Sequence, residues 1–469
     1  KPKSAKNKNN KEFAIVTYVF LALFISLAGY FCYFVAFKSE DFINSPYNAR
    51  LAKLSETIIR GDILTSDGTV VATTKVASDK TTEHRSYPYA NEYAHAIGYA
   101  VNGMSGVELD ANFNLLRSHS FILKRLVNEI TDQKNQGDSV VTTLDSRIQS
   151  VCYDQMGSYN GAVIAIEPSS GKIIAMVSKP DFDPNTIAED WKEYTSEDSS
   201  STALLNRTTQ GLYPPGSTFK IVTALEYLLE GGHETDSFTC NGSSSIDNYT
   251  IHCYHNEVHG TQTFLEAFGN SCNVAFGQIG LNIDRDHFQK LTNQLLFNQT
   301  LPTQLSNVKN SEFKLSNTDS DSIAMQTAIG QGSTVVTPIH MAMIASAIAN
   351  HGVLMEPYII DHTQNDNGNL VKQMKPIEYH SILSAKEAQS IQKYLRYVVT
   401  NGTASQLNVS NYEAYGKTGT AEYSSNKDES HSWFVGYAQQ NGKQIAIAVV
   451  MEGAGAGSAH AVPLAKSVF

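Results

Sequence analysis

The chain has 469 residues, of which 41% are hydrophobic, so it is long enough to form two or three domains with sizeable cores. Its formal net charge is −11 although five lysines lie within the first eleven residues, so the remainder of the chain is acidic. An acidic body excludes the broad basic surface with which proteins bind nucleic acid, and we expect no nucleic-acid partner.

An apolar segment follows the basic start. Residues 13–37 contain no charged side chain and would form a helix of about 37 Å, long enough to span a bilayer with some tilt. The segment is longer than a signal-peptide core, and no small-residue cleavage site follows it, which predicts an uncleaved anchor. Lysines precede it, while Lys38, Glu40 and Asp41 follow it. The charge rule for membrane proteins predicts residues 1–12 in the cytoplasm and the catalytic part outside the cell membrane.

Residues 38–150 are predicted to form a small mixed domain, called the pedestal below. Residues 60–72 have the pattern of a hairpin with its turn at Asp67-Gly68, and residues 115–130 are partly helical by pattern. The domain could be a spacer that lifts the following domain off the membrane, which is compatible with a role in binding a partner.

Residues 151–469 are predicted to form an α/β (α+β) domain. Alternating segments at 161–167 and 172–177 predict a hairpin around Pro168-Ser-Ser-Gly171. Three further strands are predicted at 413–422, 431–438 and 444–452, so both ends of the domain contribute to one five-stranded sheet. The body between them is mainly helical, with a helix capped by Thr337-Pro338 and polar loops at 188–201 and 305–322.

The stretch Tyr213-Pro-Pro-Gly-Ser-Thr-Phe-Lys220 is predicted to open a helix over residues 217–230. Ser217 and Lys220 then share one face of its first turn, with Cβ atoms about 5–6 Å apart. A serine beside an amine and the positive end of a helix dipole has the features of an activated nucleophile. An isolated S-x-x-K is more typical of a serine that only caps a helix than of a nucleophile.

Two later motifs favour the catalytic interpretation. Ser271-Cys-Asn273 follows an apolar segment, and Lys417-Thr-Gly-Thr420 lies in a predicted strand. S-x-x-K, S-x-N and K-T-G, in this order, form the signature of penicillin-binding proteins and class A β-lactamases.

The sequence resembles class B penicillin-binding proteins, which are membrane-anchored D,D-transpeptidases of peptidoglycan synthesis, over most of its length. The resemblance implies a transpeptidase fold, with a five-stranded, mainly antiparallel sheet flanked by helices, a dimerisation-like pedestal and one transmembrane helix. The other matching blocks are Arg60-Gly-Asp-Ile63 with Asp67-Gly68, Met104–Glu108, Gly161–Val177, Leu205–Arg207, Ala328–Gly332 and Ser432–Tyr437.

The resemblance also implies a reaction. Ser217 would attack the carbonyl between the two terminal D-alanines of a stem peptide, and a neighbouring amine would resolve the acyl-enzyme into a cross-link. Lys220 would be the base, with a pKa lowered by burial or by Lys417. Ser271 would relay a proton to the leaving amine, and Asn273 would bind the substrate backbone. β-Lactam antibiotics would acylate the same serine.

In the third motif, Lys417 would supply charge, while Thr418, Gly419 and Thr420 would bind the terminal carboxylate of the substrate. Backbone N–H groups of Ser217 and Thr420 would form the oxyanion hole. The alternative for the two threonines is that they reflect only the preference of threonine for strands.

Three of the five cysteines lie within 33 residues, and with a histidine they give the spacing C-x12-C-x5-H-x12-C. Three thiolates and one imidazole are a closed tetrahedral set for a structural Zn²⁺. The resemblance includes class B proteins with such a zinc, although the first two ligands are Asp in some of them. The alternatives are a disulfide between the first two cysteines, free thiols, or replacement of the histidine by His252 or His255. The predicted ligands are Cys240, Cys253, His259 and Cys272.

Two other functions share parts of this pattern. A membrane-anchored β-lactamase needs a glutamate that holds a hydrolytic water, and Glu312 begins a near match to that motif, one residue out of register. A β-lactam-sensing receptor needs a cytoplasmic output domain, for which residues 1–12 are too few.

The resemblance also implies a membrane partner. Residues 38–150 are too few for a glycan-polymerising domain, so another protein must polymerise the glycan, and class B proteins of this kind act with SEDS-family glycosyltransferases. The motifs do not distinguish roles in elongation, division and sporulation.

Overall fold

The computed structural model describes residues 6–37, 53–78, 82–422 and 429–469. The predicted apolar helix is present as α1 (Lys6–Phe37), and its segment Phe13–Phe34 is long and apolar enough to cross a membrane. None of that segment is buried against other described residues, as expected of a helix whose partner is lipid.

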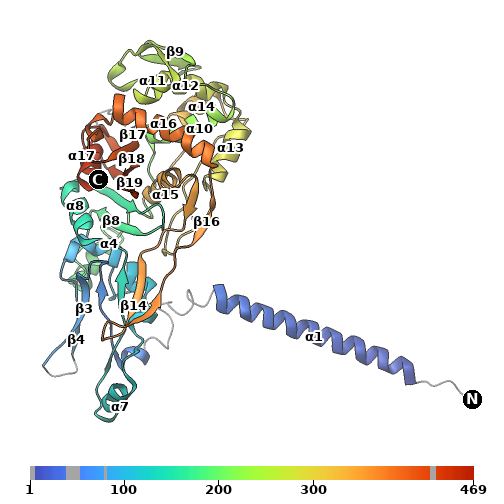
Figure 1. Cartoon of the computed structure of the whole chain (residues 1–469), viewed down its shortest axis with the longest axis vertical. Coiled ribbons are helices and arrows are strands. Elements are labelled where there is room, and N and C mark those ends of the chain that lie inside the picture. The colour runs from blue at the N-terminus through green and yellow to red at the C-terminus, as the bar shows by residue number, and fades with distance from the viewer. Residues whose placement is uncertain (1–5, 38–52, 79–81, 423–428) are drawn as a thin grey trace, which may run out of the picture.

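The pedestal is built on a six-stranded sheet with the order β15-β14-β6-β2-β3-β4. The predicted hairpin is confirmed, because β2 and β3 pair antiparallel and Gly68 in the turn has a φ of +86°. Two strands come from the second half of the chain, so residues far apart in sequence complete this sheet (Figure 1). The strands are β2 (Ile63–Leu64), β3 (Val70–Val76), β4 (Glu83–Ser86), β6 (Ser139–Thr142), β14 (Ile360–Gln364) and β15 (Leu370–Gln373).

A buried charge cluster holds the short helices of the pedestal against this sheet. The carboxylate of Glu108 accepts hydrogen bonds from Arg60 at 2.6 Å, Arg85 at 2.7 Å and Tyr87 at 3.1 Å. Arg60, the first residue of the matching block 60–63, is therefore a structural residue in this fold. The remaining pedestal elements are β1 (Ile58–Ile59), paired with β5 (Asn135–Gln136), and the helices η1 (Ala90–Tyr93), α4 (Ala94–Ile97), α5 (Gly106–Asp110), α6 (Asn112–Leu115) and α7 (Ile122–Ile130).

The second sheet has five strands in the order β17-β18-β19-β7-β8, and every neighbouring pair is antiparallel. Both ends of the predicted domain contribute, as the alternating pattern indicated. Asn441-Gly442 joins two strands with φ angles of +52° and +77°, the left-handed backbone of a tight hairpin. The strands are β7 (Gly161–Ile166), β8 (Ile173–Lys179), β17 (Glu413–Glu422), β18 (Ser430–Gln440) and β19 (Lys443–Met451).

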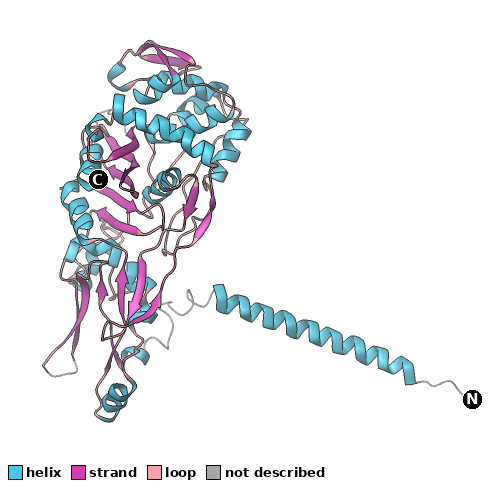
Figure 2. Ribbon diagram, in the orientation of Figure 1, coloured by secondary structure: helices cyan, strands magenta, loops and turns pink. Residues whose placement is uncertain are grey.

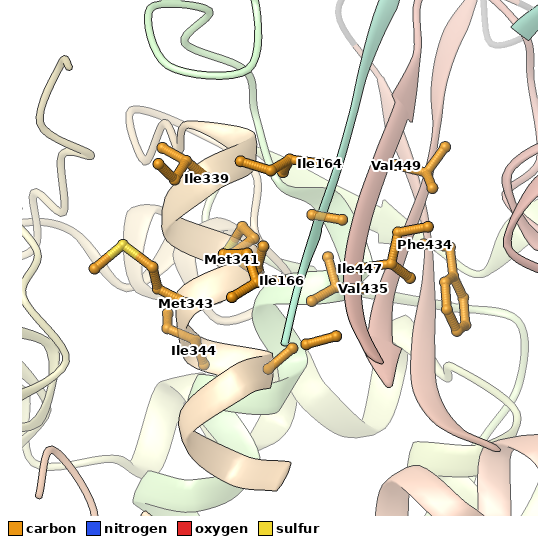
Figure 3. Close-up of a cluster of buried hydrophobic side chains, with 14 of the residues drawn as sticks. Ile164, Ile166, Ile339, Met341, Met343, Ile344, Phe434, Val435, Ile447 and Val449 are labelled. Atoms are coloured by element: carbon orange, nitrogen blue, oxygen red, sulfur yellow. The ribbon is translucent and has the colours of Figure 1, made fainter. Parts of the chain in front are cut away.

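Helix α15 (Pro338–Ala349) is buried along its whole length and packs on this sheet (Figure 3). Its predicted cap is confirmed, since the Thr337 side chain accepts from the backbone N–H of His340. The other helices surround the sheet or form the body above it (Figure 2). They are α8 (Ser146–Met156), α9 (Ile187–Thr195), η2 (Gly216–Phe219), α10 (Lys220–Leu229), η3 (Tyr254–Asn256), α11 (Phe264–Gly269), α12 (Asn273–Asn282), α13 (Arg285–Gln294), α14 (Asp321–Ala328), α16 (Ala385–Asn401), η4 (Ser405–Leu407) and α17 (Ala461–Val468).

One predicted loop was partly wrong. Residues 188–201 were expected to be irregular because they are polar, but most of the first half forms α9. Trp191 and Tyr194 pack against the small buried cluster that includes Phe182, and this tertiary contact outweighs the polar composition. The remaining strands are β9 (Ser237–Cys240), β10 (Ser243–Ile246), β11 (Tyr249–His252), β12 (Gly260–Thr263), β13 (Val353–Met355) and β16 (Glu378–Ser381).

Candidate active site

Ser217 lies in the 3₁₀ turn η2, which leads directly into α10, so the predicted helix is present with a tighter first turn. The residue before it, Gly216, has a φ of +52°, and its N–H donates to the carbonyl of Gly330 at 2.9 Å. A Cβ atom on Gly330 would lie 2.0 Å from the carbonyl oxygen of Gly216. Gly330 therefore allows this segment to support the backbone just before Ser217.

Lys220 is completely buried at the start of α10. Its Nζ atom donates to the carbonyl oxygen of Ser271 and to Oδ1 of Asn273, both at 2.7 Å, and lies 3.3 Å from Oγ of Ser271. Burial lowers the pKa of Lys220 to about 8, which makes a neutral amine accessible near physiological pH. The structure thus joins S-x-x-K directly to S-x-N.

The S-x-N motif lies in a sharp turn between α11 and α12. Ser271 has a φ of +55°, a backbone conformation that is unusual for a residue other than glycine. Asn273 begins α12, and its Nδ2 atom donates to the carbonyl oxygen of His252 at 2.7 Å. Both ends of this amide are therefore engaged, one by the buried lysine and the other by β11.

Lys417 is fully buried on β17, and its Nζ atom donates to the carbonyl oxygen of Thr418 at 3.1 Å. The Nζ atom also lies 5.8 Å from the ring centre of Phe268. Burial, and then repulsion by Lys220, hold the pKa of Lys417 well below its ordinary value. Two lysines thus share one desolvated region. For Lys220, burial is the cause of the lowered pKa.

The K-T-G strand lies against the turn that carries Ser217. A Cβ atom on Gly419 would lie 2.9 Å from Cγ2 of Thr218 and 2.9 Å from Cβ of Trp433, so glycine permits this close approach. Thr418 is buried, and its hydroxyl pairs with that of Thr403 at 2.6 Å. Thr403 was not predicted, because it follows α16 without any motif. Thr420 lies on the same strand, paired with Ser432 of β18.

The four predicted zinc ligands converge next to this site. The Sγ atoms of Cys240 and Cys253 lie 3.6 Å apart, those of Cys253 and Cys272 lie 3.8 Å apart, and Nδ1 of His259 is 3.4 Å from Sγ of Cys240. All four ligand atoms lie within 4.8 Å of one another. Sulfur atoms at the corners of a zinc tetrahedron with bonds of about 2.3 Å are roughly 3.8 Å apart, whereas a disulfide joins them at about 2.05 Å.

The surroundings of these atoms also fit a metal. Backbone N–H groups of Gly242 and Ala275 each approach a cysteine sulfur at 3.4 Å, and the Glu257 carboxylate lies 3.7 Å from Nε2 of His259. The contact between Cys253 and Cys272 lowers the pKa of Cys253 and raises that of Cys272, so the two thiols share a proton that a bound metal would displace. The imidazoles of His252 and His255 are exposed outside this group.

Comparison with known proteins identifies the family. Residues 161–469 match the penicillin binding protein transpeptidase domain, and residues 60–140 match the penicillin binding protein A dimerisation domain. The chain belongs to the class B penicillin-binding protein transpeptidase family. The family match covers the whole second sheet and all three motifs.

Two curated relatives show the extent of the similarity. Peptidoglycan D,D-transpeptidase PbpA of Mycobacterium tuberculosis is 28% identical over 463 residues, covering 92% of this chain and 93% of the relative. Peptidoglycan D,D-transpeptidase MrdA of Acinetobacter baumannii is 27% identical over 442 residues, covering 82% of this chain and 65% of the relative.

Solved structures agree with the sequence relatives. The penicillin G acyl-enzyme complex of penicillin-binding protein A from M. tuberculosis matches with a TM-score of 0.78 and 26% identity, covering 88% of this chain and 99% of that one. The D,D-transpeptidase domain of a peptidoglycan glycosyltransferase from Eggerthella lenta matches with a TM-score of 0.77 and 28% identity, covering 87% and 96%. The architecture is therefore shared over most of the chain.

Proposed function

We propose that this penicillin-binding protein is a serine D,D-transpeptidase that cross-links peptidoglycan stem peptides and is acylated by β-lactams on Ser217. The observation that carries the proposal is the buried Lys220, whose Nζ atom contacts both polar residues of S-x-N one turn of helix from the serine. Relatives with the same architecture are named as D,D-transpeptidases, and one of them forms an acyl-enzyme with penicillin G.

In the proposed reaction, neutral Lys220 accepts the hydroxyl proton of Ser217 while Oγ attacks the penultimate D-alanine carbonyl. Collapse of the tetrahedral intermediate releases D-alanine, whose amine takes a proton relayed through Ser271. An acceptor amine then attacks the ester and restores the serine. Thr418, Gly419 and Thr420 lie on the strand beside η2 and would bind the substrate carboxylate, to which Lys417 would add positive charge in its protonated form.

Intact-mass analysis of the full chain in detergent tests this proposal. The protein should gain one penicillin per chain, and Ser217→Ala should gain none. Lys220→Ala should slow acylation by a factor on the order of 10² to 10⁴, the usual contribution of a positioned base. An adduct on the Ser217→Ala protein would refute the assignment of the nucleophile.

A β-lactamase is the alternative that shares this acylation step. Glu312 does not resemble the glutamate of such an enzyme, because its backbone pairs with Val335 and its carboxylate pairs with exposed Lys314. Without a positioned base and water, hydrolysis of the acyl-enzyme is slow, so the adduct should persist for hours. Rapid loss of the adduct, slowed by Glu312→Gln, would favour the β-lactamase.

We also propose that Cys240, Cys253, His259 and Cys272 hold one structural Zn²⁺. The distances between their ligand atoms support a tetrahedral metal rather than a disulfide. A bound metal would fix Cys272, and therefore its neighbours Ser271 and Asn273, beside Lys220. Metal analysis of the purified protein should find about one zinc per chain, and Cys272→Ser should lose the metal, lower Tm and slow acylation. Metal-free wild-type protein with a Cys240–Cys253 disulfide would contradict the site.

We further propose that α1 anchors the protein with its N-terminus in the cytoplasm and contacts a SEDS-family glycosyltransferase in the membrane. The lysines before the apolar segment support the orientation, and the exposed length of Phe13–Phe34 supports a contact within the bilayer. Pull-down in detergent should recover such a polymerase, and an unrelated span in place of residues 13–37 should weaken recovery. Equal recovery with the unrelated span would mean that α1 does not contact the polymerase, so that any contact lies outside residues 13–37.

A further inference from the structure

Helix α7 turns its apolar side chains away from the protein. Five hydrophobic residues of α7 and the phenylalanine just before it are 53 to 77% exposed, and no residue of α7 is buried. A helix this short has little intrinsic stability in water, and its apolar face normally packs on a core. This apolar face consists of Phe121, Ile122, Leu123, Leu126, Val127 and Ile130.

The polar side of the same helix holds it to the pedestal. Lys124 forms an ion pair of 2.5 Å with Asp366 in the β14–β15 turn. Asn128 donates to the side chain of Asn135 at 3.0 Å and is the least exposed residue of α7. The usual arrangement of an amphipathic helix on a globular protein is therefore reversed. The apolar side is directed outward, and its transfer out of water would be favourable in free energy.

The position of α7 indicates what covers this face. Helix α7 lies at one end of the elongated body, and α11 and α12 lie at the other (Figure 1). Just after α7, Lys134 donates to the carbonyl oxygen of Ser55, and β5 pairs with β1, so the chain enters the pedestal at this end. Residues 38–52 link that entry to α1 and, at full extension, span at most roughly 55 Å.

We infer that α7 is a membrane-contact helix whose apolar face inserts into the interface of the bilayer that α1 spans. The inference rests on the proposed anchoring by α1. Phe, Leu and Ile on one side, with Lys124 and Arg125 on the other, are the composition of helices that lie in a membrane interface. A protein partner would have to supply a groove for a projecting helix, whereas the tether keeps this end near lipid whatever partner is present.

Tryptophan quenching in nanodiscs tests this inference on the full chain. Leu126→Trp places a reporter on the apolar face, and Arg125→Trp places a matched reporter on the polar side of the helix, where residue 125 is also exposed. Lipids brominated on their acyl chains should reduce the added emission of Leu126→Trp by roughly half and leave that of Arg125→Trp nearly unchanged. The two native tryptophans, Trp191 and Trp433, contribute the same background to both variants.

The outcomes are distinct. Equal quenching of the two reporters in nanodiscs that hold only this protein overturns the membrane contact. If the emission of Leu126→Trp changes only when another membrane protein is added, the apolar face binds that protein instead of lipid. Penicillin acylation, measured on the same samples, reports the catalytic site separately, so its failure with quenching intact contradicts only the proposed function. Protein that does not co-elute with nanodiscs refutes both the anchor and this inference.

Discussion

The Nζ atom of Lys220 lies 2.7 Å from Oδ1 of Asn273, so one hydrogen bond joins the first two motifs of the site. The other end of the same amide donates to the carbonyl oxygen of His252, which directly precedes Cys253. A single side chain therefore connects the proposed base with the cysteine cluster. The protonation state of Lys220 should therefore be sensitive to substitutions at residue 273.

The acylation rate should rise with pH. Burial lowers the pKa of Lys220 to about 8, so the amine is mainly protonated below this pH and neutral above it. Acylation should increase about tenfold per pH unit below that value and level off above it, because only the neutral amine accepts the serine proton. Stopped-flow acylation with a chromogenic β-lactam measures the profile. A rate that falls between pH 6 and 8 would exclude Lys220 as the base.

Asn273→Asp should move this profile to higher pH. A carboxylate beside Lys220 stabilises the ammonium form and raises its pKa, so less neutral amine is present at pH 7. A shift of about one unit would slow acylation at pH 7 about tenfold. Asn273→Ala is the matched control, since it removes the acceptor without adding charge and should not raise the midpoint. An identical midpoint in the Asp and Ala variants would contradict the prediction.

Gly330→Ala and Gly332→Ala should differ sharply although both glycines have positive φ angles. A Cβ atom on Gly330 would lie 2.0 Å from the Gly216 carbonyl oxygen, whereas on Gly332 the nearest atom is 3.7 Å away. Gly332→Ala should cost about 1–2 kcal/mol of stability for the left-handed backbone alone and leave acylation intact. Gly330→Ala should lower Tm further and slow acylation, since Ser217 must shift. Equal Tm and acylation rates would disprove the close contact.

His259→Gln should release metal, whereas His255→Gln should not. The Nδ1 atom of His259 lies 3.4 Å from Sγ of Cys240, and His255 is exposed only four residues away. Loss of one of four ligands removes much of the folding free energy that a structural zinc supplies, so Tm should fall in the first variant only. Measuring bound zinc and Tm on both variants shows which histidine is the fourth ligand of the proposed site. Metal loss in the His255 variant alone would reverse the assignment.

Glu108→Gln should destabilise the pedestal strongly. Glu108 is completely buried between Arg60 and Arg85, and these two charges hold its pKa below the ordinary value despite burial. The substitution leaves two largely buried guanidinium groups without their counter-charge, at a cost of about 3–5 kcal/mol. Glu234→Gln, in an exposed pair with Lys393, should change stability little. Urea unfolding of both variants provides the comparison.

Sequence patterns predicted those parts of the fold that depend on neighbouring residues. The strands around Pro168–Gly171 and Asn441-Gly442 follow from alternation and turn residues, and the cap at Thr337-Pro338 is equally local. The spacing of three cysteines and one histidine also identified a group that the structure brings together. In each case the deciding signal lies within a short stretch of chain.

The features that were not predicted depend on contacts between distant residues. Helix α9 is stabilised by aromatic packing that its polar sequence does not reveal. The hydroxyl pair of Thr403 and Thr418 joins two elements with no shared motif. The pairing of β14 with β6 also has no local signal, because strand register is set by the partner strand.

The hairpin that β14 and β15 add to the pedestal sheet has a mechanical consequence. The chain passes three times between the pedestal sheet and the rest of the protein. The segment from β6 to β7 leads to the five-stranded sheet, and the segments from β13 to β14 and from β15 to β16 lead to the separate β13–β16 pair, which packs on α15. A rotation of the pedestal sheet against the rest of the protein would have to bend all three connections together. If α1 anchors the protein as proposed, tilting of the α7 end of the body should carry Ser217 with it, and the distance between them would set the height above the membrane at which the proposed cross-links form.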